Sequence, residues 1–452
     1  MNISSLQHTF RMNRPNSAAF FEKAKHSMSG GVNGNLRYFA PFPIIFEKAQ
    51  GATMTDVDGH VYVDYLLSYG ALMMGHAHPV VLDAVQCVMT EQGTSSFGAT
   101  HPLELEMAEE LLALYPSFEQ IRYTNSGLEA TLFAIRLAMA ATGKTHVAKF
   151  EGHYHGAHDH VLQSVNPDAG SAGTIESPEA VPESLGTPDY YRQHSVILPF
   201  NEWDVCERIL SERADEIACV IMEPMLSGYI AADRTFLKNL RELTNQLGIV
   251  LIFDEVKTGF RIELGGAQAY YDVKPDLTAL GKVVGGGFPI GVVGGKRSIM
   301  ELASPLRSKN RSEVVFHSGT FNGNPLSIAA GLATIRYLKQ DGNFAQIVKR
   351  TDELRTGIDE LAKQYELPLQ TLGTGTIFNV LMTQEAVHNY RDLGANQSQL
   401  RLALDYLLME NGVYSKPLNR FSLSTAHGPA EIKATLDAFE KSMAALKQEL
   451  SV

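Results

Sequence analysis

The chain has 452 residues, 44% of them hydrophobic and 19% charged, which is typical of a folded globular protein with two or three domains. Its net charge of −12, from 38 basic and 50 acidic side chains, argues against general nucleic-acid binding and against anionic membrane surfaces. Three cysteines without metal-ligand spacing predict a reducing compartment, the cytoplasm, and no disulfide framework. Because no stretch has about 18 uncharged apolar residues, we expect neither a signal peptide nor a transmembrane helix.

The first 92 residues are predicted to contain helices around a small β-meander. Apolar side chains at helical spacing in residues 1–30 predict a leading helix. Residues 44–64 alternate between apolar and polar and are interrupted by glycines, which predicts short antiparallel strands. A turn at residues 75–79 then precedes a helix at about 79–92.

From about residue 100 to 300, helical patterns alternate with short apolar runs. Strand following helix in this way predicts an α/β fold with a mostly parallel sheet covered on both faces. In such sheets, ligands bind beyond the carboxyl ends of the strands. The predicted strands are residues 120–123, 147–150, 196–198, 218–222 and 249–253, and the predicted helices are 103–114, 128–139 and 237–247.

Three later segments complete the organisation. Residues 163–195 are rich in Pro, Gly, Ser, Asp and Glu, and so long a loop is usually a functional lid or disordered. Asn324-Pro325 predicts a helix start, and residues 432–446 predict an amphipathic C-terminal helix. We expect an N-terminal segment, 1–80, and a C-terminal segment, 331–452, to form a small α+β domain beside a large domain, 81–330.

The segment 276–291 places Lys282 at the end of an apolar run, three residues before Gly285-Gly286-Gly287. A lysine surrounded by backbone and apolar side chains is partly desolvated, which lowers its pKa and frees the amine. Such an amine suits a Schiff base with a carbonyl compound such as pyridoxal phosphate. Taken alone, an exposed lysine beside a flexible loop is the commoner case.

Two carboxylates, Asp254 and Glu255, end the strand predicted at 249–253. Successive side chains point to opposite faces, so the two are not expected to share a role. A buried Asp254 can keep a heterocyclic nitrogen protonated, with Val256 on the same face to pack against a flat ring. The alternative is an aspartate that caps the next turn.

The turn 124–127 lies between a strand and an amphipathic helix, which is the usual geometry of an anion site. Ser126 adds a hydroxyl, so a monophosphate could bind here. The alternative is a simple N-cap by Asn125 or Ser126. A second polar turn, 318–325, also leads into a helix.

Four histidines lie in residues 153–160, and their spacing allows metal chelation. No distant carboxylate or cysteine cluster accompanies them, so we favour a different use of this turn, in which Tyr154 stacks on a ring. A metal-dependent hydrolase built on these histidines is the alternative from another class of function.

Taken in order, the motifs resemble the fold-type I, pyridoxal-phosphate-dependent enzymes of aminotransferase class III, over nearly the whole chain. They are most similar to glutamate-1-semialdehyde aminomutases and to D-phenylglycine and β-amino-acid aminotransferases. The matching residues are Gly30-Gly31-Val32-Asn33 with Arg37, Asp56-Val57-Asp58-Gly59, Gly75-His76-Ala77-His78-Pro79, Asn125-Ser126-Gly127, Tyr154-His155-Gly156, Glu223-Pro224, Asp254-Glu255-Val256, Thr258-Gly259-Phe260-Arg261, Leu280-Gly281-Lys282, and Gly319-Thr320-Phe321 with Gly323-Asn324-Pro325.

The resemblance implies a role for each residue around the cofactor ring. Lys282 would form the Schiff base with pyridoxal 5'-phosphate and later move the proton. Asp254 would pair with the ring nitrogen, Val256 would pack on one ring face and Tyr154 on the other. Glu223 would lie at a strand end near the cofactor.

The resemblance also implies phosphate, substrate and partner contacts. Ser126 and Gly127 would hold the phosphate, and Thr320 would reach the cofactor of the other subunit in a homodimer. Arg37 would meet a substrate carboxylate, for which arginine geometry is suited. Tyr69 could line the same pocket or be a core tyrosine. Arg420 could be a second specificity residue or a surface arginine.

The implied activity is transamination: an amino group moves from a carboxylate-bearing amino acid to a keto acid or aldehyde by a ping-pong route through Lys282. Leu128 stands where many relatives have threonine, and Gly228 stands where the aminomutase usually has asparagine. These two departures favour transamination over intramolecular transfer. Ser171 could supply the serine of the aminomutase's gating region. An aminomutase and an amino-acid racemase remain the alternatives within the class.

Overall fold

The computed structural model describes residues 3–450, which form two compact units. Unit 1 consists of the described residues up to Pro79, the segment Gly342–Glu385 and the described residues from Ala395 onward. Unit 2 consists of Val80–Asp341 and the short segment Ala386–Gly394. Our division at residues 80 and 330 into separate domains stays a prediction.

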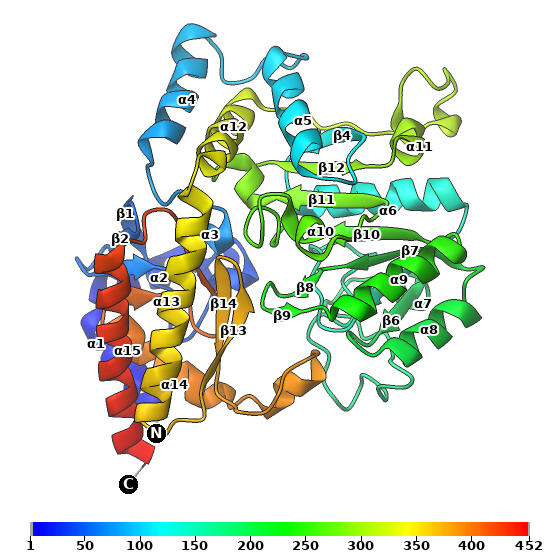
Figure 1. The fold of residues 1–452 in the computed structure, drawn as a ribbon. Coiled ribbons are helices and arrows are strands. Elements are labelled where there is room, and N and C mark those ends of the chain that lie inside the picture. The colour runs from blue at the N-terminus through cyan, green and yellow to red at the C-terminus, as the bar shows by residue number, and fades with distance from the viewer. Residues whose placement is uncertain (1–2, 451–452) are drawn as a thin grey trace. The chain divides into compact units, whose positions relative to one another are not determined.

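Unit 2 is built on a seven-stranded sheet, and the predicted α/β fold with a mostly parallel sheet is confirmed (Figure 1). Within this sheet β12 runs antiparallel to its two neighbours, and the remaining pairs are parallel. In spatial order the strands are β4 (Gln120–Thr124), β12 (Gly291–Gly295), β11 (Leu277–Gly281), β10 (Val250–Asp254), β7 (Ile217–Met222), β5 (His146–Phe150) and β6 (Ser195–Leu198).

Helices cover both faces of this sheet, which explains why its strands are apolar on both sides. Helix α6 (Gly127–Thr142) packs on β7, β10, β11 and β12, where Val250 and Ile252 join its buried cluster. On the other face lie α8 (Trp203–Glu212) and α9 (Arg234–Gln246). Each fully buried large apolar side chain contributes about 1.5–3 kcal/mol, so this double cover supplies much of the unit's stability.

The other elements of unit 2 lie outside this sandwich or in its connections. The helices are α4 (Pro79–Glu91), α5 (Pro102–Leu114), α7 (Asp189–Gln193), α10 (Gly266–Tyr271), α11 (Arg297–Met300) and α12 (Pro325–Lys339), and the short strands are β8 (Met225–Leu226) and β9 (Ile230–Ala231).

Helix α12 begins where the sequence predicts. The Asn324 side chain accepts hydrogen bonds from the backbone N–H groups of Leu326 and Ser327 at 3.0 and 3.2 Å. The helix then packs closely on the turn that follows β11. A Cβ at Gly331 would lie 2.0 Å from the Val284 carbonyl oxygen, so this approach requires glycine and supports the turn that carries Lys282.

The predicted loop 163–195 contains α7 and two isolated backbone bridges, Gln163 with Pro182 and Gly173 with Pro178. Arg391, from the segment that joins unit 2, makes a two-pronged ion pair with Glu151 at 2.8 and 3.0 Å. The same guanidinium donates to the Gly173 carbonyl at 3.1 Å. One arginine therefore holds the loop to the end of β5, and the predicted mobility of the loop stays a prediction.

Unit 1 contains the predicted β-meander, which is confirmed as β1 (Phe46–Gln50), β2 (Thr53–Asp56) and β3 (Val61–Asp64), with β15 (Val413–Tyr414) added to β3. A second sheet contains β13 (Gln370–Thr374), β14 (Ile377–Leu381) and β16 (Phe421–Ser422). The unit's longer helices are α1 (Ile3–Asn13), α2 (Pro15–Ala24), α13 (Asn343–Gln364), α14 (Ser398–Glu410) and α15 (Pro429–Leu450), and a short turn labelled α3 covers Leu67–Gly70.

Two details of unit 1 refine the sequence analysis. The single leading helix is wrong in part, because Pro15 begins α2 and separates it from α1. The core of this unit is aromatic: Phe10 is fully buried and packs against Phe42 and Tyr406 at centroid distances of 5.4 and 5.6 Å. The predicted C-terminal amphipathic helix is confirmed as α15, which buries one side of its surface.

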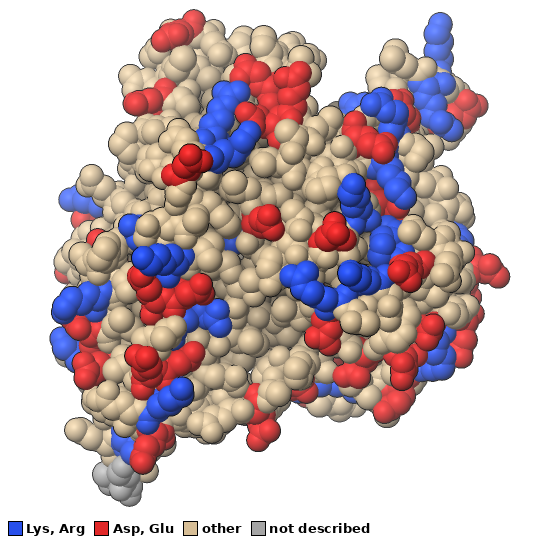
Figure 2. Space-filling view, in the orientation of Figure 1, with Lys and Arg blue, Asp and Glu red and all other residues tan. Residues whose placement is uncertain are grey.

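Charged side chains of both signs are interspersed on the face drawn in Figure 2. Some form ion pairs between helices of unit 2; Lys339 of α12, for example, lies 2.6 Å from Glu110 of α5. Within residues 3–450, no helix combines the length and apolarity that crossing a membrane requires.

Candidate active site

Four neighbouring parallel strands, β11, β10, β7 and β5, end at the same edge of the sheet of unit 2. The residues that follow them are Lys282, Asp254 at the end of β10 itself, Glu223 and Tyr154. Because parallel strands deliver their carboxyl ends to one edge, side chains far apart in sequence meet there. The predicted location of the site is therefore the place where the structure opens a pocket.

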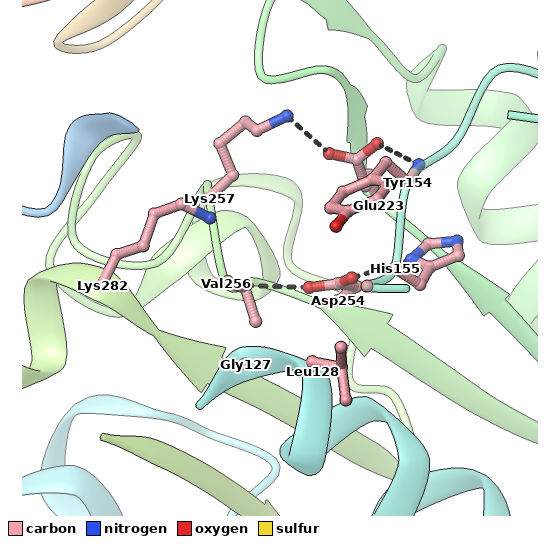
Figure 3. Close-up of a pocket in the computed structure, with 10 residues that line it drawn as sticks. Gly127, Leu128, Tyr154, His155, Glu223, Asp254, Val256, Lys257 and Lys282 are labelled. Atoms are coloured by element: carbon pink, nitrogen blue, oxygen red, sulfur yellow. Dashed lines mark hydrogen bonds and ion pairs between the residues drawn. The ribbon is translucent and has the colours of Figure 1, made fainter. Parts of the chain in front are cut away.

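This pocket is a cavity of about 200 Å³, and Figure 3 shows its lining side chains. It brings together six of the predicted site residues, and the remaining four lie elsewhere. Its lining residues are Gly127, Leu128, Tyr154, His155, Gly156, Glu223, Asp254, Val256, Lys257 and Lys282.

Asp254 is a buried carboxylate, 4% exposed, and both of its oxygens are hydrogen-bonded. One accepts from the Val256 N–H at 3.0 Å and the other lies 2.8 Å from His155 Nδ1. A carboxylate oxygen can only accept, so His155 carries its proton on Nδ1 and donates it. These two bonds fix the orientation of the Asp254 carboxylate at the edge of the pocket.

The sequence analysis assigned no role to His155, although it belongs to the Tyr154-His155-Gly156 motif. The contact joins residues 99 positions apart, and no local sequence pattern predicts it. Glu255, in contrast, points away as predicted from strand alternation: it accepts hydrogen bonds from the N–H groups of Ala267 and Gln268 at 2.5 and 3.2 Å. It anchors the start of α10 and takes no part in the pocket.

Glu223 organises the upper part of the pocket in Figure 3. One oxygen lies 3.1 Å from Lys257 Nζ, and the other accepts from the Tyr154 and Ser227 N–H groups at 3.1 and 3.4 Å. Burial alone would raise the pKa of the Glu223 carboxyl, but Lys257 and two neighbouring histidines lower it to about 2. An ionised Glu223 thus fixes the backbone at Tyr154. Lys257 was not among the predicted site residues. Its position directly after Val256 was the signal that could have identified it as a pocket residue.

Lys282 has a left-handed backbone, with φ of 54°, which is unusual for a residue with a side chain. Strained residues of this kind cluster at functional sites, where the surroundings hold them in place. Here the glycines that follow allow close packing: a Cβ at Gly286 would lie 2.5 Å from the Ala330 carbonyl oxygen. Gly286 therefore lets the turn pack against α12.

The N-terminus of α6 forms an anion cradle beside the pocket. Ser126 is the N-cap and its hydroxyl accepts from the Glu129 N–H at 3.2 Å, which leaves its own proton to donate. The N-cap alternative is therefore true, and it is compatible with phosphate binding. A Cβ at Gly127 would lie 2.7 Å from Val256 Cγ1, so only glycine lets the helix start this close to the pocket.

The ring-stacking pair predicted from sequence, Val256 and Tyr154, lines the same pocket. Tyr154 is 39% exposed, and burial together with the nearby Asp254 carboxylate raises the pKa of its hydroxyl. A carboxylate, two apolar or aromatic flanks, a lysine and a helix N-terminus are the groups that pyridoxal phosphate needs. The residues present fit that cofactor.

In unit 1, the structure brings Arg37 and Tyr69 together. The Tyr69 hydroxyl donates to the Leu36 carbonyl at 2.7 Å. Burial raises the pKa of Tyr69, while Arg37 and Arg420 act in the opposite direction. Ser68 and Tyr69 both have left-handed backbones, with φ of 53° and 58°, so this is a second strained turn. Two arginines around one tyrosine make a cationic cluster suited to a carboxylate.

Thr320 does not line the pocket of its own chain and is exposed. It lies in the polar turn before α12, and Asn322 of this turn accepts from Asn125 at 2.9 Å. The four histidines at 153–160 are not arranged as metal ligands, because no group of three or more potential ligand residues that could hold a metal occurs within residues 3–450. His155 binds Asp254 and His158 lies 3.2 Å from Thr131.

The mostly parallel sheet and the lysine, carboxylate and helix N-terminus at its edge define the class of fold-type I, pyridoxal-phosphate-dependent enzymes. The comparisons are more specific. A model of the family Aminotransferase class-III matches residues 37–439. The chain therefore belongs to the class III aminotransferase family and is a pyridoxal-phosphate-dependent enzyme.

Similar proteins of this family carry more than one activity in their names. Glutamate-1-semialdehyde 2,1-aminomutase of Methanothermobacter thermautotrophicus is 40% identical over 439 residues, covering 95% of this chain and 99% of that protein. An omega-transaminase from Sphaerobacter thermophilus is 36% identical with a TM-score of 0.90, covering 95% and 97% of the two chains. A beta-phenylalanine aminotransferase from Variovorax paradoxus is 30% identical with a TM-score of 0.85, covering 98% and 96%.

The contact between His155 and Asp254 predicts the effect of removing the imidazole. In His155→Gln, Asp254 loses the hydrogen-bond donor that orients its carboxylate, so we expect the dissociation constant for pyridoxal phosphate to rise about tenfold, which corresponds to about 1.4 kcal/mol. Titration of the cofactor's absorption measures this. His160→Gln is the matched control, because His160 packs against Tyr191 and not against Asp254. Equal affinities in both variants would contradict the role of His155.

Proposed function

We propose that this protein is an aminotransferase that moves an amino group from a carboxylate-bearing amino acid to a keto acid or aldehyde by a ping-pong mechanism. The observation that carries the proposal is the convergence of Lys282 and a doubly hydrogen-bonded Asp254 on one pocket beside the N-terminus of α6. The matching transaminases named above support it.

Bound pyridoxal 5'-phosphate supplies the carbonyl carbon that accepts the amino group and the electron sink that stabilises charge on the substrate carbon. The residues of the chain supply the rest. Lys282 Nζ would hold the cofactor, and the same amine is placed to act as the base that moves a proton at the substrate carbon. Asp254 would pair with the ring nitrogen, and Tyr154 and Val256 would flank the ring. Ser126 and the N–H of Gly127 bind the phosphate.

Replacing Lys282 tests this directly. The purified protein should show a visible absorption band from the covalently held cofactor, and Lys282→Ala should lose that band and its activity, because no amine remains to hold the carbonyl. Lys296→Ala, which changes a lysine outside the pocket, should retain both. A protein that stays colourless with added pyridoxal phosphate would rule the proposal out.

The substrate carboxylate is proposed to bind Arg37, with Tyr69 in support and Arg420 as a second candidate. In Arg37→Gln we expect KM for amino-acid donors to rise about 10- to 100-fold, because hydrogen bonds to charged groups contribute about 1.5–3 kcal/mol. KM for amines without a carboxylate should stay unchanged. Steady-state kinetics with both kinds of donor measure the difference, with Arg11→Gln as a control on another exposed arginine of unit 1. Equal effects on both donors would contradict a carboxylate site.

A second candidate is intramolecular transfer, as in glutamate-1-semialdehyde 2,1-aminomutase, and the 40% identity to such an enzyme favours it. Leu128 in the pocket argues for transamination, since many relatives have a hydroxyl there. Release of a keto product and the need for a separate acceptor would identify an aminotransferase, whereas conversion of glutamate 1-semialdehyde without an acceptor would identify an aminomutase. Racemisation of a single amino acid would identify the third possibility.

We propose a homodimer in which Thr320 contacts the phosphate held by the partner subunit. Large apolar side chains are exposed on α4, α5, the loop between these helices and the segment around Thr320, and patches of this kind commonly mark protein–protein contacts. These side chains are Val80, Leu82, Met89, Phe97, Leu105, Leu112, Phe316 and Phe321. A cytoplasmic location is proposed as well, because Cys87, Cys206 and Cys219 are not in disulfides.

Mixing two inactive variants tests the shared sites. A hybrid dimer of Lys282→Ala and Thr320→Ala contains one intact site, because the two changes fall together on the other site. Refolding an equal mixture should therefore restore activity in about a quarter of all sites, as expected for a two-fold symmetric dimer. Assay after refolding measures this, with each variant refolded alone as the control. No recovery in the mixture, or a monomer in sedimentation, would contradict the proposal.

A further inference from the structure

Lys257 is a second lysine in the pocket, and the proposed function leaves it without a task. It follows Val256 directly after β10, is only 8% exposed and lines the cavity with Lys282. Lysines are rarely buried to this degree. A buried ammonium is retained only with a partner of opposite charge, and here the partner is Glu223 at 3.1 Å.

The surroundings of this ion pair hold its charges in place. Glu223 is 2% exposed and its second oxygen is occupied by the Tyr154 and Ser227 N–H groups. The charged and titratable groups around the pair are Lys149, His153, His155, Asp254, Tyr154 and Lys282. Burial raises the pKa of the Glu223 carboxyl, but Lys257 and the neighbouring histidines outweigh it and lower that pKa to about 2. Lys257 therefore presents a fixed positive charge to the pocket.

The position of this charge matches one edge of the cofactor. Pyridoxal phosphate has polar groups on three sides of its ring. The phosphate arm and the phenolic oxygen flank the carbon that Lys282 would hold, and the ring nitrogen lies opposite that carbon. The α6 N-terminus is suited to the phosphate and Asp254 to the nitrogen. Figure 3 shows Gly127 of α6 below Lys282 and Asp254, and Lys257 with Glu223 above them. With its phosphate at the α6 N-terminus and its nitrogen at Asp254, the cofactor would direct its phenolic oxygen to the side of Lys257.

We propose that Lys257, held by Glu223, is a further cofactor-binding residue that donates to the phenolic oxygen of pyridoxal phosphate. Its charge disfavours protonation of Lys282 Nζ, the nitrogen that joins the cofactor. The proposal rests on the roles given above to Lys282 and Asp254. Among the described residues that line the pocket, Lys257 is the only lysine or arginine apart from Lys282. Because the α6 N-terminus is suited to the phosphate, the phenolic oxygen is the other anionic group of the cofactor, and the charge of Lys257 complements it.

The pH dependence of the cofactor's visible absorption tests the proposal without measuring activity. In Lys257→Met the cation is lost, so the midpoint of the absorption change should move to higher pH by about one unit or more. In Glu223→Gln the neutralising anion is lost while Lys257 remains, so the midpoint should move to lower pH. Lys257→Arg should keep the wild-type midpoint, and so should the control Lys296→Met, which removes a lysine paired with Asp276 outside the pocket.

A second variant protects the test against misfolding, because Lys257→Met leaves Glu223 buried and unpaired. Lys257→Met/Glu223→Gln removes both charges together, and its midpoint should still lie above that of the wild type, since the phenolic oxygen has lost its donor. Unchanged midpoints in this double variant and in Glu223→Gln would overturn the proposal. A higher KM for carboxylate donors with an unchanged midpoint would also overturn it, by assigning Lys257 to the substrate. A wild-type protein without a cofactor band would contradict the proposed function itself.

Discussion

The active site depends on one constraint, that β11, β10, β7 and β5 are adjacent, parallel and end at a common edge. Each strand is followed within a few residues by one of the groups that line the pocket. Hydrogen bonding along the ladders sets the spacing of the strands, and the helices on both faces keep the sheet dry. The chemistry of the site therefore depends on the rigid core and not on flexible loops.

Each of the two carboxylates at this edge has a side-chain partner. Asp254 is paired with the N–H of His155, and Glu223 with Lys257, while burial excludes the water that would otherwise screen them. Each carboxylate also accepts a backbone N–H close to the pocket, at Val256 and at Tyr154. The same bonds that orient the carboxylates thus fix the two side chains proposed to flank the ring. The same set of contacts therefore determines both where the charges lie and where the flanking side chains lie.

Two strained turns, one in each unit, carry residues of the proposed site. Lys282 in unit 2 and Ser68 and Tyr69 in unit 1 have left-handed backbones that side chains disfavour. The turn of Lys282 is pressed by α12 through Gly286 and Gly331. The turn of Tyr69 is held by Asp64, which accepts from the N–H groups of Leu66 and Leu67 at 2.8 and 3.1 Å. In each case buried neighbours offset a local cost of about 1–3 kcal/mol per residue.

The sequence by itself determined the α/β class, most strands and helices, the family and the identity of the proposed cofactor ligands, because these follow from periodicity, turn residues and motifs that are local in the chain. Only the tertiary structure decided which side chains touch. The bond from His155 to Asp254 spans 99 residues and that from Lys257 to Glu223 spans 34, and the segment 386–394 leaves its neighbours to join unit 2. Such contacts depend on strand order and side-chain direction, which no local pattern in the sequence encodes.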